Sequence, residues 1–438
     1  MARAKKEAAL TPEERLQAAL VPDWEWPYKL PGNWCWTYLT KAAECLDNFR
    51  KPINATERAG RNGNVPYYGA TGQVGWIDDF LTDEDLVLLG EDGAPFLDLI
   101  KDKAYLITGK AWVNNHAHIL RSLFGDTGNR YLLHYLNSFN YAGYVNGTTR
   151  LKLTQASMDT IPIPLPPLAE QQRIVDRIES LFAKLDEAKE KAQAVMDSFE
   201  TRKAAILHKA FTGELTAKWR EEHGVSIDNW KTTRFDSVAA IRSNLVDPAE
   251  YQSFPHIAPD NIEKKTGVLL EYHTIAEDGV TSGKHRFYSG QILYSKIRPY
   301  LSKAVVVDFD GLCSADMYPI EAYQNARCLW YYMLSDEFLL QASTAGSRSV
   351  LPKINQKELS TLTVHLPTND REQEEIARIL DELFDKEQQT KEAAEVVLDQ
   401  IDLMKKSILA RAFRGELGTN DPSEESAVEL LKKIISRG

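Results

Sequence analysis

The chain has 438 residues, a net charge of −11, and 43% hydrophobic against 26% charged residues, a composition typical of folded proteins with sizeable cores. No apolar stretch approaches the roughly 20 residues that a membrane-spanning helix needs, and the charged first residues lack the apolar core of a signal peptide. The four cysteines are scattered without a CxxC pair, which argues against a zinc site or a disulfide framework. A reducing, cytoplasmic location is therefore expected.

Residues 1–27 are predicted to form an N-terminal helical segment. Thr11 and Pro12 open the stretch TPEERLQAAL, where threonine can cap a helix and proline suits its first position.

Residues 28–166 are predicted to form a first globular domain of short strands joined by turns, with some helix. DLVLLGED at 85–92 is one such strand. The segment from Arg58 to Ile77 contains no acid and holds the turn GATG, and a second basic and tyrosine-rich segment spans 127–158. The candidates for contacting an anionic ligand in this domain are Arg58, Arg61, Tyr67, Tyr68, Thr71, Arg150 and Lys152.

Residues 167–217 are predicted to form a long helix. Its apolar residues recur in alternating steps of four and three, which is the heptad pattern of a coiled coil, and only Arg202 interrupts them. From Glu170 to Phe211 the helix should be about 63 Å long at 1.5 Å per residue. The residues expected to form its apolar row are Ile174, Ile178, Leu181, Leu185, Val195, Phe199 and Ile206.

Residues 226–366 are predicted to form a second α+β domain, with a helix over 325–343 and a strand over 358–367. The stretch 279–307 contains no Asp or Glu and interleaves basic residues with aromatic ones. Arginine can pair with two acceptors on a guanine edge, and lysine or tyrosine can hold phosphates, so this is the clearest candidate for nucleic-acid contact. The candidates here are Lys284, Arg286, Lys296, Arg298, Tyr300 and Lys303, with Arg348 and Lys353 further on.

Residues 367–417 repeat the first helix. EQQRIVDRIESLF from Glu170 recurs as EQEEIARILDELF from Glu372, and KAAILHKAFTGEL from Lys203 recurs as KKSILARAFRGEL from Lys405, both at an offset of 202. A constant offset over the whole segment favours packed helices, because one added residue would rotate everything after it by about 100°. Glu387 and Thr390 break the second row. Its expected members are Ile376, Leu380, Leu383, Val397, Ile401, Met404 and Ile408.

Residues 418–438 form a tail with a short amphipathic helix, VELLKKIISR. The chain therefore reads domain, long helix, domain, long helix, a tandem repeat with pseudo-two-fold symmetry. Copies related by a two-fold axis would pair their helices antiparallel. The predicted fold class is α+β, with two globular domains of mixed strands and helices separated by two long antiparallel coiled-coil helices.

The charge distribution bears on DNA binding. An acidic chain is unfavourable for binding phosphates, but residues 28–166 carry a net charge of only −1 and residues 226–366 one of −2. Each domain could therefore present a basic face.

Four motifs are set aside. Gly279 to His285 resembles a P-loop but is one residue short and lacks the Ser/Thr after lysine. Asp260, Glu263 and Lys265 are too crowded for carboxylates that converge on a metal from separate strands. His116 and His118 have no Cys, Asp or Glu close by in sequence to complete a ligand set, and Asp83 to Asp85 lacks the glycine and spacing of a calcium loop. No catalytic or metal residue is predicted.

These segments together resemble the specificity subunits of type I restriction-modification enzymes, and the resemblance covers nearly the whole chain. PLPPLAEQQRIVDRIESLFAKLD with KAAILHKAFTGEL resembles the family's central conserved region, and EQEEIARILDELFDK with KKSILARAFRGEL its C-terminal one. VPYYGATGQVGWIDDF, LVLLGEDG and WVNNHAHIL resemble one of its target-recognition domains, and GQILYSKIRPYLSKAVVV resembles another.

The resemblance implies that residues 28–166 and 226–366 are target-recognition domains that each read half of a bipartite DNA site. It implies that the helices act as a spacer and as a platform for two methyltransferase (modification) subunits. Restriction subunits, which combine helicase and nuclease, would also be partners. S-adenosylmethionine, Mg²⁺ and ATP are then expected in the partner subunits and none in this one. Two alternatives stay open: a self-contained nuclease built on residues 259–265, and a coiled-coil scaffold that binds proteins only.

Overall fold

The computed structural model describes residues 11–345 and 352–436. The chain forms two compact units, and each unit contains one domain together with parts of both long helices. Unit 1 comprises residues 1–192 and 396–438, and unit 2 comprises residues 193–395. Within the described residues, no helix is long and apolar enough to cross a membrane.

The two long helices have the same length and the predicted offset. Helix α7 spans Leu168–Phe211 and helix α12 spans Asp370–Phe413, each of 44 residues. Asn369 caps α12, since its side-chain oxygen accepts from the backbone N–H of Arg371 at 3.0 Å. Gly213 and Gly415 follow the helices with φ of 80° and 72°, the left-handed conformation that suits glycine after a helix end.

The boundary between the units falls inside both long helices, and the helices pair antiparallel in each unit. In unit 1, Ile174 and Ile178 near the start of α7 share a core with Leu409 and Phe413 at the end of α12. In unit 2, Leu207 and Phe211 near the end of α7 share a core with Ile376 and Leu380 at the start of α12. The antiparallel arrangement expected from the repeat is confirmed.

All seven residues expected in the apolar row of α7 are buried or half-buried. Ile174 and Ile178 are buried, and Leu181, Leu185, Val195, Phe199 and Ile206 are half-buried. Arg202, which interrupts this row, pairs with Glu387, which interrupts the row of α12: the guanidinium Nε lies 2.8 Å from the carboxylate Oε2.

In α12, two residues predicted to belong to the apolar row lie outside it. Ile376, Leu380 and Ile401 are buried and Leu383 and Ile408 half-buried, but Val397 is 39% and Met404 48% exposed. After Glu387 the row steps four residues to Lys391 instead of three to Thr390, so Leu398 and Lys405 take the places expected for Val397 and Met404. The two consecutive steps of four, 383 to 387 and 387 to 391, shift the row by one residue, and the alternation of three and four then resumes to Ile408.

The two lysines keep their stems in the row and place their ammonium groups over aromatic rings of α7. Lys391 Nζ lies 5.2 Å from the centre of the Phe199 ring in unit 2, and Lys405 Nζ lies 5.0 Å from that of Phe182 in unit 1. Long charged side chains can in this way cover apolar surface.

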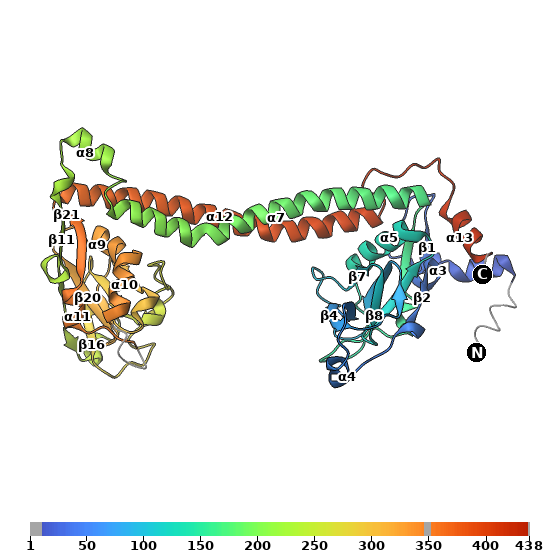
Figure 1. Cartoon of the computed structure of the whole chain (residues 1–438), viewed down its shortest axis with the longest axis horizontal. Helices are drawn as coiled ribbons and strands as arrows, with labels where there is room; N and C mark the ends of the chain where they lie inside the picture. Colours follow the sequence, from blue (N-terminus) through green and yellow to red (C-terminus); the bar gives the residue numbers. More distant parts are fainter. Residues whose placement is uncertain (1–10, 346–351, 437–438) are drawn as a thin grey trace. The chain divides into compact units, whose positions relative to one another are not determined.

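The core of unit 1 is a four-stranded sheet of order β2-β9-β6-β7, covered by α5 (Gly125–Ser138) (Figure 1). A second sheet has the order β4-β3-β8-β5, and β1 pairs with β10. The strands are β1 Cys35–Tyr38, β2 Ala43–Cys45, β3 Val65–Gly69, β4 Gly72–Ile77, β5 Thr82–Asp83, β6 Leu86–Gly90, β7 Ala104–Ile107, β8 Lys110–Val113, β9 Ala117–Ser122 and β10 Pro162–Leu165. The other α-helices among the described residues of unit 1 are α2 Pro12–Ala19, α3 Leu39–Ala42, α4 Ala55–Ala59, α6 Gln155–Met158 and α13 Ala427–Ile435.

Unit 2 repeats this plan. Its sheet of order β12-β20-β17-β18 matches β2-β9-β6-β7, and a second sheet has the order β13-β16-β19-β14-β15. A parallel strand pair occurs in each unit, β3 with β8 and β14 with β19. The strands are β11 Trp230–Arg234, β12 Ala239–Ile241, β13 Leu245–Val246, β14 Pro255–Ile257, β15 His273–Thr274, β16 Lys284–Phe287, β17 Ile292–Ser295, β18 Ala304–Val306, β19 Gly311–Cys313, β20 Met317–Ala322 and β21 Thr363–Pro367. The helices are α8 Ala217–His223, α9 Ala326–Met333, α10 Asp336–Ala345 and α11 Gln356–Thr361.

Local predictions had mixed outcomes. Helix α2 has the expected Thr11 cap, with Glu14 completing a capping box. The strand predicted over 358–367 is wrong in its first half, because Asn355 and Glu358 form a capping box that starts α11. The helix predicted over 325–343 is divided into α9 and α10 at Ser335, whose hydroxyl turns back to the Tyr332 carbonyl.

A buried glutamate lies in the first turn of each long helix. Glu372 accepts hydrogen bonds from Thr216, Arg220, Asn229 and Trp230, at 2.7–3.0 Å. Burial alone would raise its pKa, but the four donors outweigh burial and lower it. Glu170 is the equivalent residue in unit 1 and has two side-chain donors, Thr419 and Arg173, so burial dominates and raises its pKa.

Candidate nucleic-acid interface

The predicted lysines of unit 2 are engaged within the fold. Lys284 lies on β16, only 8% exposed, and donates to the Ser282 hydroxyl at 2.7 Å. Lys303 donates to the Pro259 carbonyl at 2.7 Å, and Lys296 donates to the Ala315 carbonyl. Lys353 pairs with Asp316 at 3.1 Å. These ammonium groups stabilise loop connections.

The guanidinium of Arg286 stacks among aromatic rings. It lies 4.9 Å from the centre of the Tyr288 ring, 5.4 Å from that of Tyr251 and 6.0 Å from that of Phe254. Its Nε is buried without a hydrogen-bond partner in the described part of the chain. Arg286 is thus held in a fixed orientation beside the partly exposed ring of Tyr288.

Arg298 and Tyr300 lie between β17 and β18, where Arg298 directly precedes the short 3₁₀ turn Pro299–Leu301 and Tyr300 lies within it. Both are exposed, Tyr300 to 47%. Arg298 has a left-handed backbone with φ of 47°, and its side chain has no hydrogen bond or ion pair with the residues that the structure describes. Arg348 lies outside the described residues.

In unit 1 the candidates near the β3–β4 hairpin form cation–aromatic pairs. Arg58 lies 4.8 Å from the ring centre of Tyr67, and Arg61 lies 4.7 Å from that of Trp112 while pairing with Asp78 at 2.6 Å. Tyr67 is 1% exposed, so its ring packs against Arg58 and is not available to contact a ligand. Tyr68 is half-buried against Tyr105, and Thr71 is exposed at the turn between the strands.

Arg150 and Lys152 are neutralised by acids of the β6–β7 loop. Arg150 pairs with Asp92 at 2.7 Å and Lys152 with Glu91 at 2.9 Å. Arg50, which no sequence motif singled out, binds Glu91 and also Asp47, at 2.9 Å from the latter. Arg50 and Glu91 are 41 residues apart in the sequence, so no local sequence pattern reveals that they pair.

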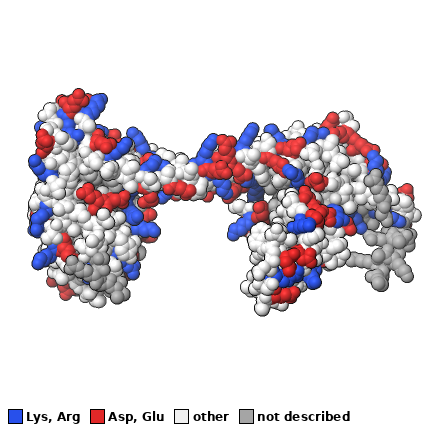
Figure 2. All heavy atoms as spheres, in the orientation of Figure 1, with Lys and Arg blue, Asp and Glu red and all other residues white. Residues whose placement is uncertain are grey.

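Basic and acidic side chains are interspersed on each unit. Figure 2 shows no continuous basic surface on the face drawn, in either unit. This agrees with the nearly neutral charge of the two domains and favours a few selected contacts over a broad electrostatic attraction.

Three ligand-type side chains converge in unit 1: Cys45, Asp47 and His118. Asp47 already accepts from His118 at 2.6 Å, from the Ile119 N–H at 2.9 Å, and pairs with Arg50. Burial raises the pKa of the Cys45 thiol to about 12, so the thiolate that metals bind is unfavourable. The donor set does not fit a metal ion, and no other such group occurs within residues 11–345 and 352–436.

The segments set aside in the sequence give no catalytic arrangement. Asp260 is fully exposed, and its nearest ion-pair partner is Lys303 at 3.7 Å. Lys265 has a left-handed backbone and its N–H bonds the Leu301 carbonyl at 3.0 Å. The nuclease alternative built on residues 259–265 therefore has no support.

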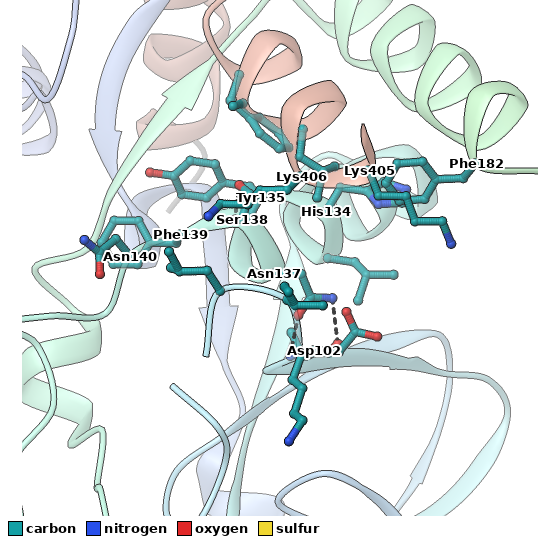
Figure 3. Close-up of a pocket in the computed structure, with 18 of the residues that line it drawn as sticks. Asp102, His134, Tyr135, Asn137, Ser138, Phe139, Asn140, Phe182, Lys405 and Lys406 are labelled. Carbon is teal, nitrogen blue, oxygen red and sulfur yellow. Dashed lines mark hydrogen bonds between the residues drawn. The ribbon is translucent and has the colours of Figure 1, made fainter. Parts of the chain in front are cut away.

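A cavity of about 810 Å³ lies in unit 1 between α5, the 99–106 segment and the end of α12. Figure 3 shows Lys405 and Lys406 of α12 and Phe182 of α7 lining it, together with Asp102 and Asn137. His134 lines it as well, and burial lowers the pKa of its imidazole to about 4. Asn137 closes the floor by accepting from the backbone of Lys103 at 2.7 Å and of Ala104 at 2.9 Å.

The chain is similar in sequence to known proteins over most of its length. A family model described as type I restriction modification DNA specificity domain matches residues 46–195 and 227–397. The type I restriction enzyme EcoDI specificity subunit of Escherichia coli is 35% identical over 405 residues, 86% of this chain and 89% of that protein. The EcoKI specificity subunit of Escherichia coli K12 is 26% identical over 345 residues, 69% of this chain and 70% of that protein.

Two solved structures share the fold. A chain from a study of complex assembly and conformational transition of the type I R-M system superposes with a TM-score of 0.63 at 18% identity, over 89% of this chain and all of that one. The HsdS subunit from Thermoanaerobacter tengcongensis superposes with a TM-score of 0.56 at 18% identity, over 90% of this chain and all of that one.

Proposed function

The chain belongs to the family of type I restriction-modification DNA specificity proteins, and from this membership we propose that it is the subunit that selects the DNA sequence for such an enzyme. The domains in residues 28–166 and 226–366 would each read one half of a bipartite site. The observation that supports this most is the duplication itself: each unit holds one α+β domain of the same plan together with half of each long helix.

The helix pair would set the number of unread base pairs between the half-sites. Both helices have 44 residues at an offset of 202, so the two copies agree in length with no insertion or deletion between them. Half-sites about one helical turn apart, roughly 34–36 Å, lie on one face of the duplex. Joining two weak readers raises their effective concentration, which gives the pair a higher affinity than either alone.

The methylation and cleavage chemistry would belong to partner subunits. Two modification subunits would bring S-adenosylmethionine, and restriction subunits would bring Mg²⁺ and ATP. No residue of this chain is assigned a catalytic role. We place the complex in the cytoplasm, and the four cysteines, all unpaired, suit that compartment.

The test is to map methylated sites after the full chain, assembled with its modification subunits, acts on random duplex DNA. We expect one bipartite sequence. Replacing residues 226–366 by the corresponding domain of the EcoDI subunit should change one half-site and leave the other unchanged. Methylation without sequence preference, or a change in both halves at once, would contradict the proposal. A chain that binds only protein, the remaining scaffold alternative, would give no selected sequence.

A further inference from the structure

The same pattern of backbone hydrogen bonds occurs in each domain directly after an inner strand, β6 in unit 1 and β17 in unit 2. In unit 1 the Glu91 N–H bonds the His116 carbonyl at 2.8 Å, and in unit 2 the Lys296 N–H bonds the Asp316 carbonyl at 3.0 Å. The same two residues then accept, Glu91 from Leu153 and Lys296 from Ile354. The equivalence relates 91 to 296.

Two residues after Glu91 and Lys296, the backbone of each domain adopts the left-handed conformation. The Gly93 N–H bonds the Leu151 carbonyl at 3.1 Å and has φ of 74°; the Arg298 N–H bonds the Pro352 carbonyl at 2.7 Å and has φ of 47°. Glycine adopts this conformation without penalty, whereas an arginine does so at a cost in free energy. Pro299 adds to the strain, since a residue before proline favours extended backbone.

A guanidinium lies at this turn in each domain, but it belongs to a neighbouring segment in unit 1 and to the turn itself in unit 2. In unit 1, a Cβ added at Gly93 would lie 3.1 Å from Nε of Arg150, so the glycine makes room for that side chain. Arg150 is neutralised there by Asp92. In unit 2 the arginine is part of the turn itself, and the residue equivalent to Asp92 is the uncharged Ile297.

The other cations around Arg298 are already bound. Lys296 donates to the Ala315 carbonyl, Lys303 to the Pro259 carbonyl, and Lys353 pairs with Asp316. Arg298 is exposed and has no such partner among the residues that the structure describes. Within residues 11–345 and 352–436, Arg298 has no side-chain interaction that a ligand would have to replace. Backbone strain without benefit to the fold is typical of functional positions.

From this turn we propose that Arg298 is a specificity-determining residue of the second domain, which reads a guanine in its half-site. The inference rests on the proposed function. An arginine fork pairs with O6 and N7 of guanine in the major groove, and the left-handed turn fixes the backbone position from which the Arg298 side chain extends. A phosphate contact would need only charge and no defined backbone direction.

The test uses the full chain assembled with its modification subunits, random duplex DNA, and sequencing of methylated sites. The variants are Arg298→Ala, Arg298→Lys and Arg298→Gly. Lys357→Ala is the matched control, because Lys357 is an exposed cation on α11 of the same unit. Thermal unfolding of each purified chain accompanies the DNA measurement.

We expect all three Arg298 variants to lose preference at one position of one half-site, by about tenfold or more. Arg298→Gly should melt at or above the wild-type temperature because glycine relieves the left-handed strain, which separates reading from folding. Lys357→Ala should keep the wild-type sequence. Unchanged specificity, full retention in Arg298→Lys, or uniform weakening without a change of sequence would overturn the assignment of a base contact. If the wild-type complex itself selects no bipartite site, the proposed function fails first.

Discussion

The guanidinium of Arg202 and the carboxylate of Glu387 meet at 2.8 Å in unit 2, at the two places where the apolar rows of the long helices are interrupted. Their side chains are 33% and 21% exposed, so each charge is partly removed from water. The two interruptions compensate each other: a polar residue in one helix is tolerated because the other supplies its partner.

Replacing one member of this pair should cost more than replacing both. Arg202→Leu or Glu387→Leu alone leaves an unpaired, half-buried charge and should destabilise unit 2 by about 1–3 kcal/mol, whereas the double leucine variant should recover most of that loss. Urea unfolding of the four chains measures the coupling. The exposed pair Lys189–Asp402 in unit 1 is the control and should couple by less than about 1 kcal/mol. Additive losses at Arg202 and Glu387 would rule out the compensation.

The corrected apolar row of α12 can be tested with residues three and four apart. Val397→Gln and Met404→Gln should change the free energy of unfolding by less than about 0.5 kcal/mol, because both side chains are exposed. Ile401→Ala should cost about 2–4 kcal/mol, since Ile401 is 3% exposed. Equal losses at all three positions, measured by denaturant unfolding, would restore the uninterrupted heptad.

The equivalent buried glutamates Glu170 and Glu372 should change the stability of their units with pH in opposite directions. The folded-state pKa of Glu372 is lowered, so its ionised carboxylate stabilises unit 2 above pH 4.5, and this contribution is lost as the pH falls through the folded pKa. The folded-state pKa of Glu170 is raised, so its contribution is lost as the pH rises above 4.5. At pH 7, Glu372→Gln should destabilise by about 2–4 kcal/mol and Glu170→Gln far less. Equal effects in thermal unfolding would show that the donors around Glu372 give no advantage.

His134 should make unit 1 sensitive to mild acid. Burial lowers the pKa of its imidazole from 6.5 to about 4, so the unfolded state takes up a proton that the folded state resists. Stability is full above pH 6.5 and falls as the pH drops toward 4, by up to about 2 kcal/mol at pH 5. His134→Leu should remove this part of the pH dependence while keeping an apolar contact with Phe182. Parallel stability–pH curves for the two chains between pH 7 and 5 would contradict the assignment.

The proposed measuring role of the helices predicts the result of lengthening them together. Four residues inserted after Ala192 and after the equivalent Ala394 add about 6 Å to each helix. We expect the complex to methylate half-sites separated by a changed gap, or to lose activity. Sequencing of methylated random DNA gives the answer, and an unchanged gap at full activity would exclude a spacer function.

The sequence predicted the repeat, the long helices and their direction, because a 202-residue offset and a periodic apolar row are visible along the chain. It missed the shift of the row after Glu387, since Leu398 and Val397 are equally apolar neighbours and only the packing across α7 decides between them. It also missed that residues 358–361 belong to a helix, α11, because the capping residues Asn355 and Glu358 outweigh the strand-like pattern of the sequence.

The candidate DNA contacts were less predictable. In the sequence, Lys284, Lys296 and Lys303 have the same surroundings as Arg298: each is a basic residue in a stretch rich in aromatic residues. In the structure, however, these lysines donate hydrogen bonds to carbonyl and hydroxyl oxygens that only the fold brings close. Neutralisation of Arg150 by Asp92 spans 58 residues. Which of these side chains meets DNA remains a prediction, and the backbone conformation of Arg298 is a signal that composition alone does not carry.

The discontinuity of unit 1 has a consequence for synthesis on the ribosome. The core around Ile174 and Tyr131 includes Leu409 and Phe413, so the domain that is translated first lacks part of its interior until residue 413 has emerged. Unit 2 is a single stretch that ends at Glu395 and has all its residues earlier. The later-encoded domain should therefore finish folding first, and premature termination near residue 395 would leave the earlier one with exposed apolar surface.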